Sequence, residues 1–193
     1  MVSGDAHIFR KISVFRYWTG LQKEIKIMRK VVNLNQGWKF TRENAGLPKI
    51  LPEEWKDVEL PHTWNAVDGQ DGNGGYYRGC CWYARNFETP CQPLPGGRVY
   101  VEVLAAGQQA SVYVNGQKAV YHEGGYSVFR ADVTELCSAD GKNLLAIACD
   151  NSYKDSVYPQ SADFTFYGGL YRGIISSAFQ RFTLIWIIMA VRG

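Results

Sequence analysis

The chain has few of the residues from which metal and redox centres are built. Of its 193 residues, three are histidine and five are cysteine. No cysteines show C-x-x-C spacing or histidine partners at zinc-site spacing, so no zinc site is expected. An odd number of cysteines cannot all pair within one chain. We therefore expect free thiols and a cytoplasmic protein; the cysteines are Cys80, Cys81, Cys91, Cys137 and Cys149.

The body of the chain also lacks an excess of positive charge. The net charge is +3, but residues 28–173 carry 14 basic and 16 acidic side chains, and the surplus of positive charge lies in the two ends. A nucleic-acid-binding domain would present a clustered basic face. No nucleic-acid partner is expected.

Apolar runs long enough to cross a membrane are missing too. The uncharged, β-prone run Phe182–Val191 is shorter than the about 20 residues that a spanning helix needs. Near the start, Ile8–Trp18 is interrupted by Arg10, Lys11 and Arg16, and no small-residue cleavage site follows. We expect neither a membrane anchor nor a signal peptide.

No convincing amphipathic helix interrupts a series of short apolar or alternating runs. One run ends in Asn115-Gly116, a pair that tolerates positive φ and predicts a type I′ hairpin turn into 118–121. Turn-forming residues separate the other runs, which predicts an all-β fold. The expected strands are Trp82–Phe87, Val99–Leu104, Ala110–Val114 and Leu144–Cys149.

A set of motifs extends this pattern. The hairpin segment SVYVNGQKAVYHEGGY and the aromatic-glycine segment DFTFYGGLYR occur together with four further motifs. These are NQGWKF, LPHTWN, YRGCCWY and DNS. In this order they resemble the N-terminal sugar-binding domain of glycoside hydrolase family 2, and the bacterial β-galactosidase branch looks most similar. β-Glucuronidases and β-mannosidases of the family share this domain, so the resemblance leaves the substrate open.

The resemblance implies a jelly-roll β-sandwich (galactose-binding-domain-like) over residues 28–173. It also implies hydrolysis of terminal β-glycosides, such as β-galactosides, by two glutamates on a (β/α)₈ barrel. A barrel needs about 250 residues, so the 193 residues here leave no room for it. We expect this chain to be inactive alone. Two alternatives remain: a non-catalytic carbohydrate-binding module, or a fragment that assembles with a separately encoded barrel.

Asp163 is the principal site residue that the resemblance implies. In family β-galactosidases, an aspartate at this position touches sugar hydroxyls and helps to hold a sodium ion, which suits a carboxylate. The alternative is a turn acid paired with Arg172. The resemblance implies no cofactor for this chain itself, and sodium and magnesium for the full-length enzyme.

The glycine-rich loop Asp68–Gly79 is the second region that faces the active site in relatives. Its candidate sugar contacts are Asn73, Tyr77 and Arg78, whereas Asp71 is interpreted as a turn residue. His62 is interpreted as a hydrogen-bonded structural imidazole, and most tryptophans as core residues. Seven glutamates are interpreted as solvated or structural: Glu43, Glu53, Glu54, Glu59, Glu102, Glu123 and Glu135.

Both ends look foreign to this domain. Residues 1–27 are interpreted as a translated leader or a disordered arm, because Met28 begins a family-like segment. A possible DNA sequence for Thr183–Gly193 encodes a different peptide when the reading frame starts one base earlier. That peptide is HFDLDYYGGPG, the continuation that the family resemblance implies. We therefore expect a frameshift between Arg172 and Thr183, and residues 174–193 as a non-native tail.

Overall fold

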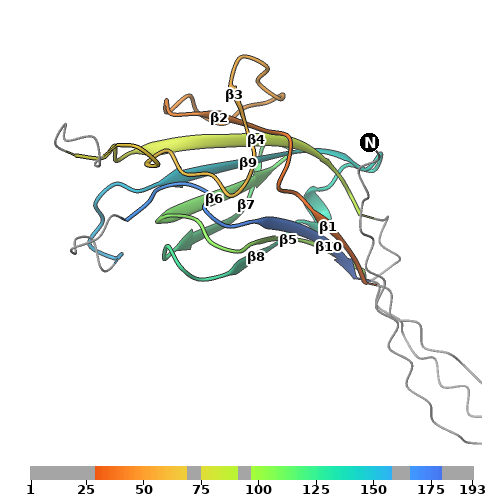
Figure 1. Ribbon diagram of the computed structural model, residues 1–193. Helices are drawn as coiled ribbons and strands as arrows, with labels where there is room; N and C mark the ends of the chain where they lie inside the picture. Colours follow the sequence, from red (N-terminus) through yellow and green to blue (C-terminus); the bar gives the residue numbers. More distant parts are fainter. Residues whose placement is uncertain (1–28, 69–74, 91–96, 158–165, 180–193) are drawn as a thin grey trace, which may run out of the picture.

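The computed structural model describes residues 29–68, 75–90, 97–157 and 166–179. These residues form two antiparallel sheets that pack face to face (Figure 1). The expected all-β sandwich is confirmed. Within the described ranges there is one short 3₁₀ helix, η1 (Thr134–Leu136), and no helix long and apolar enough to cross a membrane.

One sheet has four strands in the order β1-β10-β5-β8, and the other has six in the order β3-β2-β4-β9-β6-β7. All four strands expected from the sequence are present, within a residue or two of the expected bounds. The strands are β1 (Arg29–Asn33), β2 (Trp38–Thr41), β3 (Lys56–Val58), β4 (Cys80–Glu88), β5 (Arg98–Val103), β6 (Gln109–Val114), β7 (Gln117–Glu123), β8 (Phe129–Asp132), β9 (Lys142–Asp150) and β10 (Ile174–Phe179).

The β6–β7 hairpin confirms the turn that the Asn-Gly pair predicts. Asn115 has φ +50° and Gly116 has φ +81°, as a type I′ turn requires at both central positions. The Asn115 side chain also bonds to Leu136 O at 2.8 Å and Asn143 Oδ1 at 2.9 Å. The turn is thereby tied to the η1 segment and to β9.

The core lies between the sheets and follows the two-residue period of the strands. On β5, Val99, Val101 and Val103 are buried, whereas the residues between them are half-buried. β4 and β9 pair over nine residues at the centre of the larger sheet, where Tyr83 and Ile147 face the same core. Apolar burial of this kind is the main stabilising contribution to such a sandwich.

Strand β10 lies beyond residue 173, where the sandwich was expected to end. Ile174–Phe179 lies between β1 and β5, pairing with five residues of the first and six of the second. Its inward side chains Ile174 and Ala178 belong to the core. The sandwich therefore continues at least to Phe179, because without β10 the strands β1 and β5 would not be joined.

Candidate functional site

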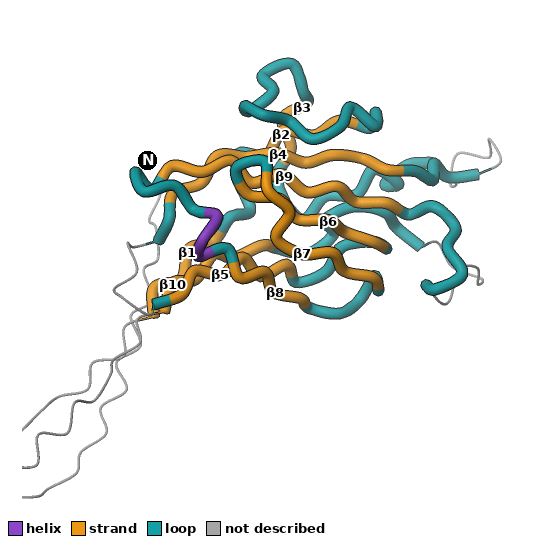
Figure 2. Tube along the Cα trace, turned by 180° about the vertical axis from the view of Figure 1, so that it is seen from behind, coloured by secondary structure: helices purple, strands orange, loops and turns teal. Residues whose placement is uncertain are grey.

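Three segments converge around the ends of the strands, and the third is remote in the sequence from the first two. The 60–68 segment follows β3, the 75–79 segment precedes β4, and the 166–173 segment precedes β10. The first and third are joined directly, because His62 N–H donates to Leu170 O at 2.9 Å. Figure 2 shows the connecting segments of the chain as teal loops at the ends of the two sheets.

Gly169 allows the last of these segments to approach the others closely. Its φ of +114° favours glycine, and a Cβ here would lie 2.7 Å from His62 O and 2.8 Å from the Tyr83 hydroxyl. On its other side, Gly107 N–H donates to Gly169 O at 2.9 Å. A side chain at this position would push the 166–173 segment off the sandwich.

Two fully buried asparagines, Asn65 and Asn151, connect all three segments by hydrogen bonds. Asn151 Oδ1 accepts from Gly79 N–H at 2.8 Å, and Asn65 Oδ1 accepts from Gly168 N–H at 2.8 Å. The two amides are joined, with Asn151 Nδ2 donating to Asn65 Oδ1 at 3.3 Å. Both amides also donate to Tyr77 O, at 3.0 and 3.1 Å. Such satisfied buried networks fix one arrangement of the backbone.

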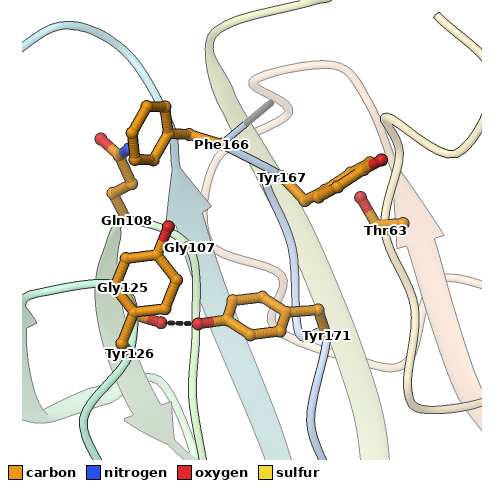
Figure 3. Close-up of a pocket in the computed structure, with 8 residues that line it drawn as sticks. All are labelled: Thr63, Gly107, Gln108, Gly125, Tyr126, Phe166, Tyr167 and Tyr171. Atoms are coloured by element: carbon orange, nitrogen blue, oxygen red, sulfur yellow. Dashed lines mark hydrogen bonds between the residues drawn. The ribbon is translucent and has the colours of Figure 1, made fainter. Parts of the chain in front are cut away.

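An aromatic pocket of about 350 Å³ opens beside this network (Figure 3). Its aromatic walls come from two loops: Tyr126 from the loop after β7, and Phe166, Tyr167 and Tyr171 from the 166–173 segment. The Tyr171 hydroxyl donates to Gly125 O, which joins the two loops. The remaining lining residues are Thr63, Gly107, Gln108 and Gly125.

Gln108 is the polar group in this pocket that sequence reasoning missed. Its side chain is buried, and its Oε1 has no hydrogen-bond partner among the described residues. The segment Ala-Ala-Gly-Gln-Gln gives no local signal for a site, because the pocket exists only where 166–171 packs across it. The aromatic-glycine segment itself was singled out from the sequence, and Tyr167 and Tyr171 lie in it.

Tyr77, a predicted sugar contact, is engaged in holding its own loop. Its N–H donates to Asp68 Oδ2 at 2.9 Å, and its hydroxyl donates to Arg42 O at 3.1 Å. The Arg42 guanidinium lies over its ring at 4.8 Å and forms an ion pair with Asp68 at 3.0 Å. The ring remains partly exposed, so its role in binding a sugar stays a prediction.

Arg78, the neighbouring candidate, lies between two tyrosine rings. Its guanidinium is 4.0 Å from the Tyr153 ring centroid and 4.6 Å from that of Tyr76. It also donates to Asn151 O at 3.0 Å. Arginine between aromatic faces, bonded to a backbone carbonyl, is a stable structural arrangement, and a contact from Arg78 to a sugar stays a prediction.

Asp163 and Asn73 lie outside the described residues, as does Asp71. The described part of the chain resumes at Phe166, three residues after Asp163, on the wall of the aromatic pocket. The roles predicted for Asp163 in sugar and sodium binding therefore stay predictions. In the described ranges no cluster of three or more His, Cys, Asp or Glu side chains has the geometry of a metal site.

His62 has the structural role predicted for it. Its Nδ1 lies 2.8 Å from the Tyr83 hydroxyl, and its ring packs against Phe40 at 4.7 Å between centroids. Burial, with a smaller effect from the nearby Lys56, lowers the pKa of the imidazole below its usual value. His62 is therefore kept neutral and joins the 60–68 segment to β4.

The tryptophans and glutamates agree with the interpretations made from the sequence. Trp38, Trp64 and Trp82 are buried, so none of them offers an open stacking surface. Among the glutamates, Glu102 pairs with Arg130 and Glu123 with Lys154. These two carboxylates therefore form ion pairs at the surface of the sandwich.

Comparisons with known proteins agree with the family resemblance. The family model of the glycosyl hydrolases family 2 sugar-binding domain matches residues 68–178. An FMN-binding beta-glucuronidase from Faecalibacterium prausnitzii L2-6 is 53% identical, with a TM-score of 0.69 over 78% of this chain and 22% of that one. The chain is 28% identical to a Bacteroides fragilis beta-glucuronidase over 166 residues, 84% of this chain and 23% of the relative.

A beta-galactosidase from Thermoanaerobacter pseudethanolicus is also 28% identical, over 76% of this chain and 20% of the relative. The chain thus spans about a fifth of the length of these relatives. The match of the family model covers more than half of the chain and includes β4 to β9 and most of β10. The chain belongs to glycoside hydrolase family 2, and what it carries is the N-terminal sugar-binding domain of that family.

Proposed function

We propose that this domain serves an enzyme that hydrolyses terminal β-glucuronides. The observation that carries this proposal is the 53% identity to the Faecalibacterium prausnitzii beta-glucuronidase over 78% of the chain. The sequence motifs had favoured β-galactosides, and a beta-galactosidase is among the relatives. A β-galactoside is therefore the second candidate substrate.

The domain would contribute to the reaction by positioning a side chain near the substrate. In family hydrolysis, one carboxylic acid protonates the leaving oxygen while a second carboxylate attacks the anomeric carbon, and water then releases the sugar. Both groups belong to the barrel, so the 193-residue chain is expected to be inactive alone. Asp163 is proposed to reach the sugar hydroxyls, and to help hold sodium in the full enzyme, from a position three residues before the fixed 166–173 segment begins.

The network around Asn65 and Asn151 supports this role. It anchors the chain on both sides of Asp163, since Asn151 precedes Asp163 and bonds to Asn65 Oδ1 at 3.3 Å, and Gly168 follows Asp163 and donates its N–H to the same oxygen at 2.8 Å. A loop with a fixed base loses less conformational entropy when it contacts substrate. The domain would thereby place a carboxylate without supplying the chemistry.

A chimera tests the proposal. Residues 28–179 replace the corresponding domain of the Faecalibacterium prausnitzii enzyme, and hydrolysis of 4-nitrophenyl β-D-glucuronide and β-D-galactoside is measured. We expect activity on the glucuronide, and a loss of about 100-fold in kcat/KM in Asp163→Ala, since a charge-assisted contact to a sugar hydroxyl is removed. Asp155→Ala, at an exposed aspartate, is the matched control and should leave kcat/KM unchanged.

Two results would count against the proposal. A folded chimera that prefers the galactoside would favour the second candidate substrate. Equal rates for Asp163→Ala and Asp155→Ala would remove the assigned role of Asp163.

A further inference from the structure

Strand β4 has one edge that its neighbour β2 covers only in part. β2 pairs with β4 from Trp82 to Ala84, whereas β9 pairs with the opposite edge along the whole of β4. No described strand therefore lies beside the first edge from Arg85 to Glu88. An open strand edge presents backbone N–H and C=O groups that can pair with another chain.

The backbone of Asn86 faces this open edge. Its opposite residue on β9, Leu144, turns its carbonyl away from β4, because Leu144 O accepts from Asn115 N–H at 2.9 Å. In an antiparallel pair, opposite residues either both point their backbone groups at each other or both point them away. Asn86 N–H and C=O therefore point away from β9. Arg85 Nε donates to Asn86 O at 3.0 Å, and Asn86 N–H has no acceptor outside the strand ladders among the described residues.

A polar groove of about 610 Å³ lies along this edge. It is bounded by the 49–51 segment, by the end of β4 and by the start of β9. The charged side chains that line it are Lys49, Arg85, Lys142 and Glu88. None of these four forms an ion pair with a described residue, although ion pairs form elsewhere on the domain. The groove therefore has a local surplus of positive charge.

Arg85 is the cation that is best placed to hold a partner. Its side chain is half-buried, and its guanidinium lies 5.8 Å from the ring centroid of the buried Trp38. Burial lowers the pKa of this guanidinium below its usual value, because the charge is partly removed from water. Its two Nη groups have no hydrogen-bond partner among the described residues. A carboxylate could accept from both, which is the geometry that arginine favours.

The charge of the groove decides between possible occupants. Residues 1–27 carry five basic and two acidic side chains, and residues 180–193 carry two arginines and no acid. Neither end of the chain therefore complements the groove. A second copy paired through the same edge would place its cations opposite those of the first, which is unfavourable. A different protein that presents acidic side chains is the complementary partner.

We propose that the open edge of β4 binds an extended, acidic peptide segment of a separate protein. The segment would lie beside residues 85–88 as an added strand, accept a hydrogen bond from Asn86 N–H, and place carboxylates near Arg85 and Lys142. Arg85 and Glu88 are three residues apart, about 10 Å along a strand, so the edge has room for three or four residues. This interaction surface is separate from the proposed hydrolysis and goes beyond it.

Titration of the full 193-residue chain with short peptides tests the proposal. The probe Ac-Glu-Val-Glu-Val-Glu-NH₂ alternates carboxylates with an apolar side chain that can contact Ile50, which is 78% exposed in the groove. We expect saturable shifts of the Asn86 and Lys142 amides in ¹H–¹⁵N spectra at low salt, with a Kd of about 1 mM. The glutamine counterpart of the probe should bind at least about fivefold more weakly, because it lacks the charges.

Variants assign the binding to this edge. Lys49→Gln combined with Lys142→Gln removes two exposed charges and should weaken binding of the glutamate peptide at least about fivefold. Lys118→Gln, at an exposed lysine on β7 outside the groove lining, is the matched control and should bind as the parent chain does. Asn86→Pro removes the N–H at the open edge and no ladder bond to β9, and should weaken binding about fivefold.

Four outcomes would overturn the proposal. The first is a flat titration of the folded chain with the glutamate peptide, and the second is equal binding of its glutamine counterpart. The third is equal affinity in the double lysine variant and in Lys118→Gln. The fourth is inorganic phosphate that binds as tightly as the peptide, which would indicate a site for small anions.

Asn86→Pro tests the added strand by itself. A folded Asn86→Pro chain that binds the glutamate peptide as the parent does would overturn the strand-like mode of binding. If this variant does not fold, the comparison of the lysine variants still decides. Because no hydrolysis is measured, failure here leaves the chimera experiment independent.

Discussion

Asn151 shows how single polar side chains hold the loops of this domain. It follows β9 directly, and its fully buried side chain makes three hydrogen bonds to other described residues. Its partners are Gly79 N–H, Asn65 Oδ1 and Tyr77 O. Hydrogen bonds like these contribute modestly when made, but a partner left unpaired in the interior is costly. The cost of removing the Asn151 side chain therefore comes mainly from the hydrogen-bonding groups that lose their partner.

Asn151→Ala is expected to destabilise the chain by about 2–3 kcal/mol. It removes the acceptor of Gly79 N–H and one of the donors to each of Asn65 Oδ1 and Tyr77 O. Urea unfolding followed by tryptophan fluorescence measures this change. Asn86→Ala, at an exposed asparagine on β4, is the control and should stay within about 0.5 kcal/mol. Equal losses in the two variants would show that the Asn151 network does not support the fold.

His62 should give the domain a pH dependence near neutrality. Its pKa in the folded chain is lowered by burial from the usual 6.5, so the unfolded chain binds its proton more readily. Stability from this group is therefore complete above about pH 6.5 and is lost as pH falls through the lower, folded pKa. The slope in that window is at most about 1.4 kcal/mol per pH unit for one proton.

Urea midpoints between pH 7.5 and 5 measure this effect, and His62→Gln should flatten the profile in that range. Glu123 provides an internal comparison, because the hydrogen bond from Lys154 lowers its pKa to about 2. Its contribution is lost only as pH falls from about 4.5 toward 2. A profile that is equally steep above pH 5 with and without His62 would contradict the assignment.

At the scale of elements, strand β10 joins the smaller sheet. It lies between β1 and β5, and its loss would expose two strand edges and the apolar face that they cover. A chain ending after Gly173 should therefore show no cooperative thermal transition, whereas one ending after Phe179 keeps every described strand and should unfold cooperatively. Circular dichroism melts compare the two. A cooperative melt for the shorter chain would mean that the sandwich closes without β10.

The strands differ in how well sequence alone predicts them. β5, β6 and β9 were predicted because alternation or a short apolar run is local information, and Asn115-Gly116 fixes its hairpin locally. β10 was assigned to a non-native tail because a frameshift was expected between Arg172 and Thr183. No local pattern indicated the strand, since its place depends on pairing with strands some 75 and 145 residues earlier in the chain. Gln108 was missed for the same reason. Its burial depends on the 166–171 segment, which only the folded chain brings to it.

At the scale of the whole molecule, stability should rise toward the middle of the larger sheet. β9 pairs with β4 over nine residues and with β6 over six, and five consecutive residues within it are buried. β3 pairs over three residues at the edge of the same sheet. Local opening is easiest where few buried contacts must break. The amides of β4 and β9 should therefore exchange only through global unfolding.

Native-state hydrogen exchange in low urea tests this gradient. We expect the slowest exchange at Leu145–Cys149, with a free energy equal to that of global unfolding, and exchange at least about 100-fold faster in β3. Comparable rates in β3 and β9 would contradict it. Asn151 is the residue directly after β9. The hydrogen-bond network of Asn65 and Asn151 is therefore attached to the strand that we expect to be the most stable. The loops are thereby positioned before any sugar arrives, and binding need not supply the free energy to order them.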